Sequence, residues 1–269
     1  MEYKLFKDKI VITGKEDFNP THILECGQVF CYKKEEGCYF VYPGDKSAQI
    51  VETKDGYEIR TTTPEFFAKY FDLDTNYSAI KKELNGFKMM NEPIKFGYGI
   101  RILKQDLFEM LISFIISSNN NIKRIQLILN NIRSRLGGNF PSQKLLLKQS
   151  EEFFKECGAG YRAKYLYNVI RQVSPEKLEE WSALDSTTLR NNLIALSGVG
   201  PKVADCVMLF GYGRGDVFPV DTWIHQMYNA HFPHLDNRNQ IRDNLVSYFG
   251  KLSGYAQQYL FYYQRSVKK

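Results

Sequence analysis

The hydrophobic period of this chain changes once, near residue 64, and that change limits the folds open to it. Up to about residue 60, short runs rich in β-branched and aromatic residues alternate with turn-rich segments such as Lys54-Asp55-Gly56. These runs predict strands at residues 4–6, 10–12, 29–32, 38–42, 49–51 and 57–60. We therefore expect an antiparallel sheet in the first part of the chain.

From Pro64 onward the apolar residues follow helical spacing, as where Phe67, Tyr70 and Phe71 share one face. Further helices are predicted at residues 106–118, 122–136, 161–173, 187–196, 202–210, 221–232, 239–249 and 255–267. The expected fold class is α+β. Residues 1–92 would form an N-terminal antiparallel β-sheet domain with accessory helices, and residues 93–269 a mostly α-helical domain.

Composition indicates a folded protein without a membrane segment. Hydrophobic residues make up 43% and charged residues 25%, both close to globular averages. The longest apolar stretches are far shorter than the roughly 20 residues of a membrane-spanning helix. Residues 1–14 lack the apolar core and cleavage site of a signal peptide, so the expected compartment is the cytoplasm, with nucleoid association in a prokaryote.

Charge favours a polyanionic partner without deciding on one. The chain has 36 Lys and Arg against 30 Asp and Glu, a net charge of +6. Such a balance supports phosphate contacts and counterion release on binding nucleic acid. Many proteins that bind no nucleic acid are equally basic, so only the sequence motifs can indicate which partner the chain binds.

The segment Leu196–Cys206 has the most informative pattern, Leu-Ser-Gly-Val-Gly-Pro-Lys-Val-Ala-Asp-Cys. Gly198 and Gly200 permit a sharp turn and a close approach of the backbone to a ligand, and Pro201 suits the first position of a helix. The pattern predicts a helix-hairpin-helix over about residues 187–211, where a DNA phosphate would dock on the amides that begin the second helix. A glycine-rich connection with no ligand is the alternative.

Lys202 and Asp221 are the candidate catalytic residues. Lys202 lies in the first turn of the second hairpin helix, where the positive end of the helix dipole disfavours the protonated amine and favours a nucleophile. Asp221 ends an apolar run and opens the next helix. Singly, they could be a phosphate-binding lysine and an N-cap. Together they supply an amine and a carboxylate for attack at a sugar carbon that develops positive charge.

These two segments resemble the signature of the helix-hairpin-helix (HhH-GPD) DNA glycosylase superfamily. Within it, the similarity is strongest to the 8-oxoguanine DNA glycosylase/AP lyases, and it extends over nearly the whole chain. Five segments carry it in the family's order: residues 25–30, 114–122, 158–165, 202–206 and 254–261.

The resemblance implies a bifunctional enzyme of base excision repair that removes 8-oxoguanine from duplex DNA. Lys202 would attack the anomeric carbon and form a Schiff base, and the strand would be cut by β-elimination. Asp221 would stabilise the oxocarbenium-like sugar and help to position or deprotonate the amine.

The resemblance also implies the contacts to the oxidised base. Phe261 and Cys206 would enclose the flipped purine, Gln257 would bind its Watson–Crick edge, and the Gly27 carbonyl would accept the N7–H that guanine lacks. Four-residue spacing puts Cys206 on the same helix face as Lys202, and Phe261 on that of Gln257. Core packing explains Cys206 and Phe261 as well, and a turn explains Gly27.

A second implied set contacts the DNA opposite the lesion. Asn119, Arg124 and Arg162 would bind the cytosine left unpaired, and Tyr161 would enter the vacated stack. Extrusion of the lesion is required because its reacting sugar carbon is hard to reach inside a duplex. A capped turn is the other explanation of the Asn119 segment.

No catalytic metal is expected, because no Cys, His or acidic set has ligand spacing, and the five cysteines form no Cys-x-x-Cys pair. The resemblance implies a monovalent cation near the carbonyls of Ile194, Leu196 and Val199 as the one candidate cofactor. Trp223 stands where eukaryotic-type members often carry a histidine, so no phosphate contact is carried over to it. The expected partner is double-stranded DNA containing 8-oxoguanine, bound by a monomer.

Two other functions stay open on the sequence. One is a glycosylase for a different lesion, such as an alkylated purine or a formamidopyrimidine. The other is a non-catalytic helix-hairpin-helix module that binds DNA structure, which would not need Lys202 and Asp221 together.

Overall fold

A computed structural model describes residues 1–267, which form two compact units. The first, here called the sheet unit, comprises residues 1–41, 47–104 and the residues from 213 onward. The second, called the hairpin unit, comprises residues 42–46 and 105–212. The domain boundary expected between residues 92 and 93 stays a prediction, because a compact unit is not the same thing as an independently folding domain.

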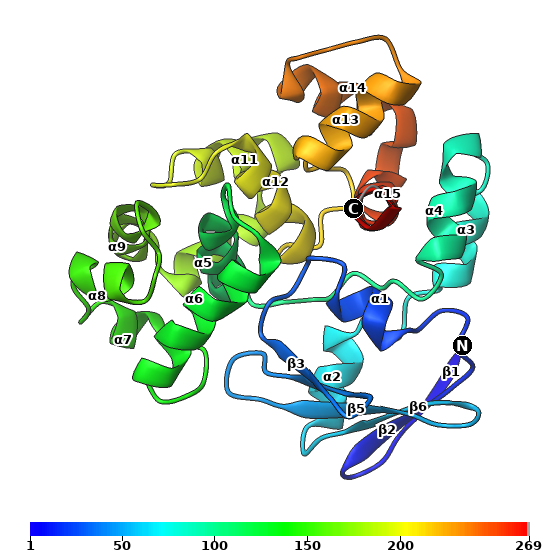
Figure 1. Ribbon diagram of the computed structural model, residues 1–269, viewed down its shortest axis with the longest axis horizontal. Coiled ribbons are helices and arrows are strands. Elements are labelled where there is room, and N and C mark those ends of the chain that lie inside the picture. The colour runs from blue at the N-terminus through cyan, green and yellow to red at the C-terminus, as the bar shows by residue number, and fades with distance from the viewer. Residues whose placement is uncertain (268–269) are drawn as a thin grey trace. The chain divides into compact units, whose positions relative to one another are not determined.

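Six antiparallel strands form one sheet in the order β1-β2-β6-β5-β4-β3 (Figure 1). Ile10 pairs with Ile59 and Ile12 with Tyr57, so these side chains project from one face and are buried there. The helices α1 (Pro20–Leu24) and α2 (Pro64–Tyr70) cover that face. The strands are β1 (Glu2–Leu5), β2 (Lys9–Thr13), β3 (Tyr32–Glu35), β4 (Cys38–Val41), β5 (Ala48–Glu52) and β6 (Gly56–Arg60).

Five of the six predicted strands are confirmed, and one was placed too early. The strand predicted at residues 29–32 begins only at Tyr32. The residues before it form a buried connection that the Gln28 side chain holds. Its amide donates to the carbonyls of Ile23 and Arg101, and its oxygen accepts from the Leu103 amide. A side chain there makes the hydrogen bonds that a neighbouring strand would otherwise make.

The remaining helices of the sheet unit pack around a second apolar core. In this core α15 contacts α4, α13 and α14, and buries Ala256, Tyr259 and Leu260. The helices are α3 (Tyr77–Leu84), α4 (Asn91–Phe96), α13 (Thr222–His231), α14 (Arg238–Phe249) and α15 (Ser253–Val267), with 3-10 turns at Lys88–Met90 and Gly250–Leu252.

The hairpin unit is built around α5 (Leu107–Ser117), in which every residue from Leu107 to Ile116 is buried. This helix packs against α6, α9, α10 and α12, while α11 packs against α12 and α8 against α9. The other helices are α6 (Ile122–Arg135), α7 (Gln143–Leu146), α8 (Glu151–Glu156), α9 (Arg162–Gln172), α10 (Pro175–Glu180), α11 (Ser186–Ile194) and α12 (Pro201–Phe210), with a 3-10 turn at Trp181–Ala183.

The helical reading after Pro64 is confirmed: no strand follows Arg60 in residues 1–267. Phe67, Tyr70 and Phe71 are buried as their spacing predicts. The prediction missed six helices of four to eight residues, α1, α3, α4, α7, α8 and α10, which are too short to show a clear period. Within the described chain, no helix is both long and apolar enough to cross a membrane.

Arg101 joins several connecting segments of the sheet unit and is itself fully buried. Its guanidinium donates to the carbonyls of Phe71, Asp17 and Thr75 at 2.9, 3.0 and 2.9 Å, and also to that of Asp72. It lies over the Tyr77 ring, 4.1 Å from the centroid. Five donors in a planar fork suit Arg for collecting several carbonyls at one place.

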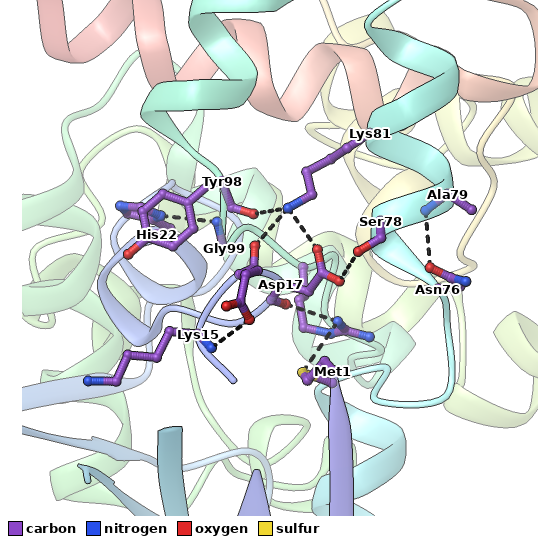
Figure 2. Close-up of polar contacts among 12 residues, drawn as sticks. Met1, Lys15, Asp17, His22, Asn76, Ser78, Ala79, Lys81, Tyr98 and Gly99 are labelled. Carbon is purple, nitrogen blue, oxygen red and sulfur yellow. Dashed lines mark hydrogen bonds and ion pairs between the residues drawn. The ribbon is translucent and has the colours of Figure 1, made fainter. Parts of the chain in front are cut away.

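Lys81 performs a similar task next to Asp17. Figure 2 shows its ammonium reaching the Tyr98 carbonyl and the Asp17 carboxylate, at 2.9 and 2.7 Å. Ser78 donates to the same carboxylate. Burial by itself raises the pKa of Asp17, but the hydrogen bonds from Lys81 and Ser78 outweigh it and hold that pKa below its ordinary value. The ion pair thus fixes α3 to the segment before α1.

Replacing Arg101 by Met should destabilise the protein by about 3 kcal/mol or more, because buried carbonyls lose their donors. Arg135→Met is the matched control. Its guanidinium makes an exposed ion pair with Glu156, and its loss should cost less than about 1 kcal/mol. Urea unfolding of both variants measures the difference, and equal costs would contradict the role given to Arg101.

Candidate active site

The predicted helix-hairpin-helix is present, with its turn between α11 and α12. The turn closes with a hydrogen bond from the Val199 amide to the Leu196 carbonyl, at 3.1 Å. Gly198 has φ +79°, and a Cβ built on it would lie 2.6 Å from the Cβ of Tyr165. The Ser197 amide donates to the Gln172 side chain at 2.8 Å. Because Tyr165 and Gln172 both belong to α9, that helix supports the hairpin from one side.

A buried ion pair joins the two helices of the motif. The Nε of Arg190 on α11 lies 2.7 Å from a carboxylate oxygen of Asp205 on α12, and Asp205 is 2% exposed. Breaking a buried pair by removing one partner is costly, so this contact holds the angle between the helices. Asp205 therefore has a structural role, although it lies close to Lys202 in sequence.

Lys202 lies half-buried in the first turn of α12. Its Nζ is 3.5 Å from the Ser117 hydroxyl oxygen and 5.4 Å from the centroid of the Phe114 ring. No carboxylate of the hairpin unit pairs with this ammonium in the described residues. Cys206 follows one turn later and is 3% exposed. The spacing argument for a shared helix face agrees with this arrangement.

The residues expected opposite the lesion lie together at the start of α6 and α9. Tyr161 is 56% exposed, and its ring lies 4.3 Å from the Arg162 guanidinium. Arg162 is itself buried and donates to the carbonyls of Ser118, at 2.8 Å, and Asn119, at 2.8 Å. Asn119 has φ +48°, so Arg162 holds an unusual turn. Arg124 is exposed, with Nη2 3.5 Å from the Gly158 carbonyl.

Asp221 lies in the sheet unit as the N-cap of α13. Its Oδ1 accepts the Ile224 amide at 2.9 Å, as N-caps do. The run that precedes it is buried, with Val217 and Phe218 fully inaccessible. Gln257 of α15 donates to the Pro219 carbonyl in this run at 3.5 Å. Asp221 therefore caps α13, and the cap fixes where its carboxylate lies. A cap can also have a catalytic role.

Gly27 and Phe261 meet closely in the sheet unit. Gly27 has φ +87°, and a Cβ built on it would lie only 3.0 Å from Phe261 Cε1. Both the backbone conformation and the lack of space therefore require glycine. The preceding carbonyl, that of Cys26, accepts the Gln258 amide of α15 at 3.0 Å. The loop before Gly27 is thus fastened to the helix that carries Gln257 and Phe261.

Two titratable groups next to this loop are neutral near physiological pH. Burial lowers the pKa of His22 to about 4 and raises the pKa of the Cys26 thiol to about 11. The nearby charged groups are Glu25 and Arg265 of α15. The Glu25 carboxylate accepts a hydrogen bond from the Tyr39 hydroxyl and forms an ion pair with Lys34. The Arg265 guanidinium lies 5.2 Å from the centroid of Phe261.

Each unit brings its own share of the expected residues together. The hairpin unit groups Lys202 with Cys206, and separately groups Asn119, Arg124, Tyr161 and Arg162. The sheet unit links Gln257 to the run before Asp221, and Gly27 to Phe261.

Sequence reasoning missed the supporting residues. Phe114 and Ser117 next to Lys202, and Tyr165 and Gln172 under the hairpin, act through contacts between separate helices. No local sequence pattern predicts contacts between separate helices. Arg265 could have been found, because it continues the four-residue spacing of Gln257 and Phe261 on one helix.

Comparison with known families decides the classification. Residues 10–111 match the family described as 8-oxoguanine DNA glycosylase, N-terminal domain, and residues 112–249 match the HhH-GPD superfamily base excision DNA repair protein. The chain belongs to the HhH-GPD superfamily of base excision DNA repair proteins. Its α+β architecture, a six-stranded sheet followed by a helical core, is the one the sequence predicted.

Known N-glycosylase/DNA lyases resemble the chain in sequence. An N-glycosylase/DNA lyase of Saccharomyces cerevisiae is 36% identical over 174 residues, 56% of this chain and 46% of that protein. A probable N-glycosylase/DNA lyase of Methanothermobacter thermautotrophicus is 30% identical over 231 residues, which cover 72% of this chain and 71% of that protein. The chain spans about half the length of the yeast relative and of an Arabidopsis thaliana one, 46% and 53%.

A solved structure matches the full length. It is the Clostridium acetobutylicum 8-oxoguanine glycosylase/lyase in complex with double-stranded DNA containing cytosine opposite 8-oxoguanine. The TM-score is 0.94 at 36% sequence identity, and the alignment covers 100% of this chain and 99% of that one.

The hairpin glycines make a matched pair for mutation. Gly198→Ala should destabilise the protein by about 2 kcal/mol, because its φ is positive and the new Cβ overlaps Tyr165. Gly200→Ala should cost less than about 1 kcal/mol, since φ is −90° and nothing lies within 4 Å of its Cβ position. Thermal unfolding compares the two, and an equal loss for both would refute the packing of Gly198 against Tyr165.

Proposed function

We propose that this HhH-GPD protein is a bifunctional DNA glycosylase and AP lyase that excises 8-oxoguanine from duplex DNA. The observation that carries the proposal is Lys202 at the N-terminal end of α12, half-buried and without a carboxylate partner in the described hairpin unit. A surface lysine that only contacts phosphate does not need this setting. The family match and the full-length similarity to an 8-oxoguanine glycosylase/lyase support the same activity.

The chemistry follows from an amine and a carboxylate. The free amine of Lys202 attacks the anomeric carbon of the damaged nucleotide, and the bond from that carbon to the base breaks with its electrons going to the base. The bond from the anomeric carbon to the ring oxygen then breaks with its electrons going to oxygen, which takes up the proton that the attacking nitrogen loses, and an imine joins Lys202 to the opened sugar. Removal of a proton from the adjacent carbon expels the 3′ phosphate by β-elimination. Asp221 stabilises the positive charge that develops on the sugar.

The base contacts are proposed residue by residue. The Phe261 ring stacks on the purine, the Gly27 carbonyl accepts its N7–H, and Gln257 binds its Watson–Crick edge. Cys206 is proposed as a further contact to the purine. The Oε1 of Gln257 is buried and has no hydrogen-bond partner in residues 1–267. An unpaired buried acceptor is costly, and an N–H of the bound base would satisfy it.

The DNA contacts around the lesion are proposed for the hairpin unit. Tyr161 is exposed enough to enter the base stack, and the guanidinium of Arg162 supports its ring. Asn119, Arg124 and Arg162 are assigned to the cytosine that the extruded lesion leaves behind. Gly198 and Gly200 are assigned to the phosphate that the hairpin binds, where small residues let the backbone approach.

The remaining assignments concern cofactors, assembly and compartment. We propose no catalytic metal, and a monovalent cation on the carbonyls of Ile194, Leu196 and Val199 as the one candidate ion. The Leu196 carbonyl accepts one hydrogen bond within the turn, which leaves a second lone pair for such an ion. We propose that the protein acts as a monomer in the cytoplasm, and on the nucleoid in a prokaryote.

Single-turnover assays on a duplex with one 8-oxoguanine test the roles of Lys202 and Asp221. Lys202→Gln should abolish strand cleavage in the absence of alkali, because the glutamine amide cannot form an imine. Asp221→Asn should slow base release by about 100-fold or more, since charge stabilisation is lost. Asparagine is as good an N-cap as aspartate, so α13 should remain folded.

Lys177→Gln serves as the control for Lys202→Gln, because Lys177 is exposed and pairs with nearby Glu180. It should leave both rates unchanged. Alkali-independent cleavage at the wild-type rate by Lys202→Gln would contradict the proposed nucleophile. Duplexes with an alkylated purine or a formamidopyrimidine in place of 8-oxoguanine decide whether a different lesion is preferred.

A further inference from the structure

Arg265 continues the face of α15 that carries the two proposed base contacts. Gln257, Phe261 and Arg265 are spaced by four residues, so their side chains lie along one side of the helix. The guanidinium of Arg265 lies 5.2 Å from the Phe261 ring centroid and 5.9 Å from that of Tyr262. A cationic side chain therefore lies next to the ring that is proposed to stack on the base.

Arg265 also contacts the loop that presents Gly27. Its Nη2 donates to the Glu25 carbonyl. Its Nη1 lies 3.0 Å from the point where a Cβ on Gly27 would be, and Phe261 Cε1 lies at the same distance from that point. Gly27, the Phe261 ring and one nitrogen of Arg265 therefore converge on one spot.

That nitrogen has no partner. Nη1 of Arg265 is buried and makes no hydrogen bond in the described part of the chain. A buried N–H on a charged group that lacks an acceptor is expensive, and native proteins rarely keep one without a reason. An acceptor that arrives with a ligand would provide that reason.

The carbonyls of the loop show the complementary pattern. Those of Glu25 and Cys26 are each bound by a side chain of α15, from Arg265 and Gln258. No hydrogen bond to the Gly27 carbonyl occurs within residues 1–267. The Gly27 carbonyl is thus an acceptor that makes no hydrogen bond within residues 1–267. Arg265 Nη1, which lies beside Gly27, is a donor that makes none there either.

We propose that Arg265 is a specificity-determining residue that donates from Nη1 to the oxygen on carbon 8 of the oxidised base. An 8-oxopurine carries N7–H and this oxygen on adjacent ring atoms, a donor next to an acceptor. The Gly27 carbonyl and Arg265 Nη1 match the pair. Guanine has neither group, because its N7 is a bare acceptor and its carbon 8 carries only hydrogen. The inference rests on the proposed function and adds a second contact to the oxidised edge.

The test changes the base atom and the residue together. Single-turnover excision is measured on duplexes with 8-oxoguanine or 8-thioxoguanine opposite cytosine, by wild type and by Arg265→Leu. Sulfur keeps N7–H but is a much weaker acceptor than oxygen. In wild type, the rate for the oxygen base should exceed that for the sulfur base by about 10-fold to 100-fold, as for a hydrogen bond to a charged donor.

In Arg265→Leu, the rate for 8-oxoguanine should fall by a similar factor, and the oxygen-to-sulfur ratio should decrease at least about 5-fold. Any steric penalty of the larger sulfur is present in both proteins and cancels in this comparison. A purely structural Arg265 would lower both rates equally. An unchanged ratio in Arg265→Leu therefore overturns the inference, however far the absolute rates fall.

Two further variants control for folding. Arg171→Leu removes a guanidinium that also stacks on a tyrosine and donates to carbonyls but is assigned no contact to the base, and it should leave the ratio at its wild-type value. Arg265→Lys keeps the charge but lacks the two-nitrogen fork, so one ammonium cannot occupy both the Nη2 position at the Glu25 carbonyl and the Nη1 position beside Gly27. If Arg265→Leu melts at too low a temperature to assay, Arg265→Lys must show the reduced ratio.

The outcomes separate the two proposals. If wild type excises 8-oxoguanine but neither Arg265 variant changes the ratio, only the role of Arg265 fails. If wild type excises neither base, the proposed function fails and the role of Arg265 with it.

Discussion

Main-chain carbonyls that are buried outside helices and strands need donors, and in this protein the side chains of Arg and Gln supply many of them. Arg101 binds four such carbonyls in the sheet unit, and Gln28 holds the connection before β3. Arg162 does the same for the turn at Ser118 and Asn119. The loops at Gly27 and Asn119, which carry two of the proposed contacts, are therefore held by side-chain hydrogen bonds although they have no regular secondary structure.

The two proposed catalytic residues take their positions from ordinary helix-end chemistry. Lys202 follows a proline at the start of α12, and Asp221 is the N-cap of α13. The positive end of the dipole at a helix start attracts a carboxylate, which suits Asp221 as the cap of α13. The local fold thus gives each of the two residues a defined place at the start of a helix.

Much of this was readable from the sequence, since period and end signals are local. The change of period at Pro64 predicted the α+β class, and the Gly-Val-Gly-Pro segment predicted the hairpin. Contacts between distant segments were not readable. Gln28 replaces a strand where an apolar run favoured one, and Tyr165 explains Gly198 only once α9 is in place. The four-residue spacing marks Arg265, but its contact with Gly27, which precedes it by most of the chain, is visible only in the fold.

The central claim is that Lys202 forms an imine with the sugar of an oxidised guanine nucleotide. Borohydride trapping tests it most directly, with duplexes that hold 8-oxoguanine opposite each of the four bases and undamaged duplex as the control. We predict a covalent protein–DNA adduct with the lesion, most with cytosine opposite it, and none with undamaged DNA or with Lys202→Gln. Base release without any trapped adduct, or an adduct that persists in Lys202→Gln, would contradict the claim.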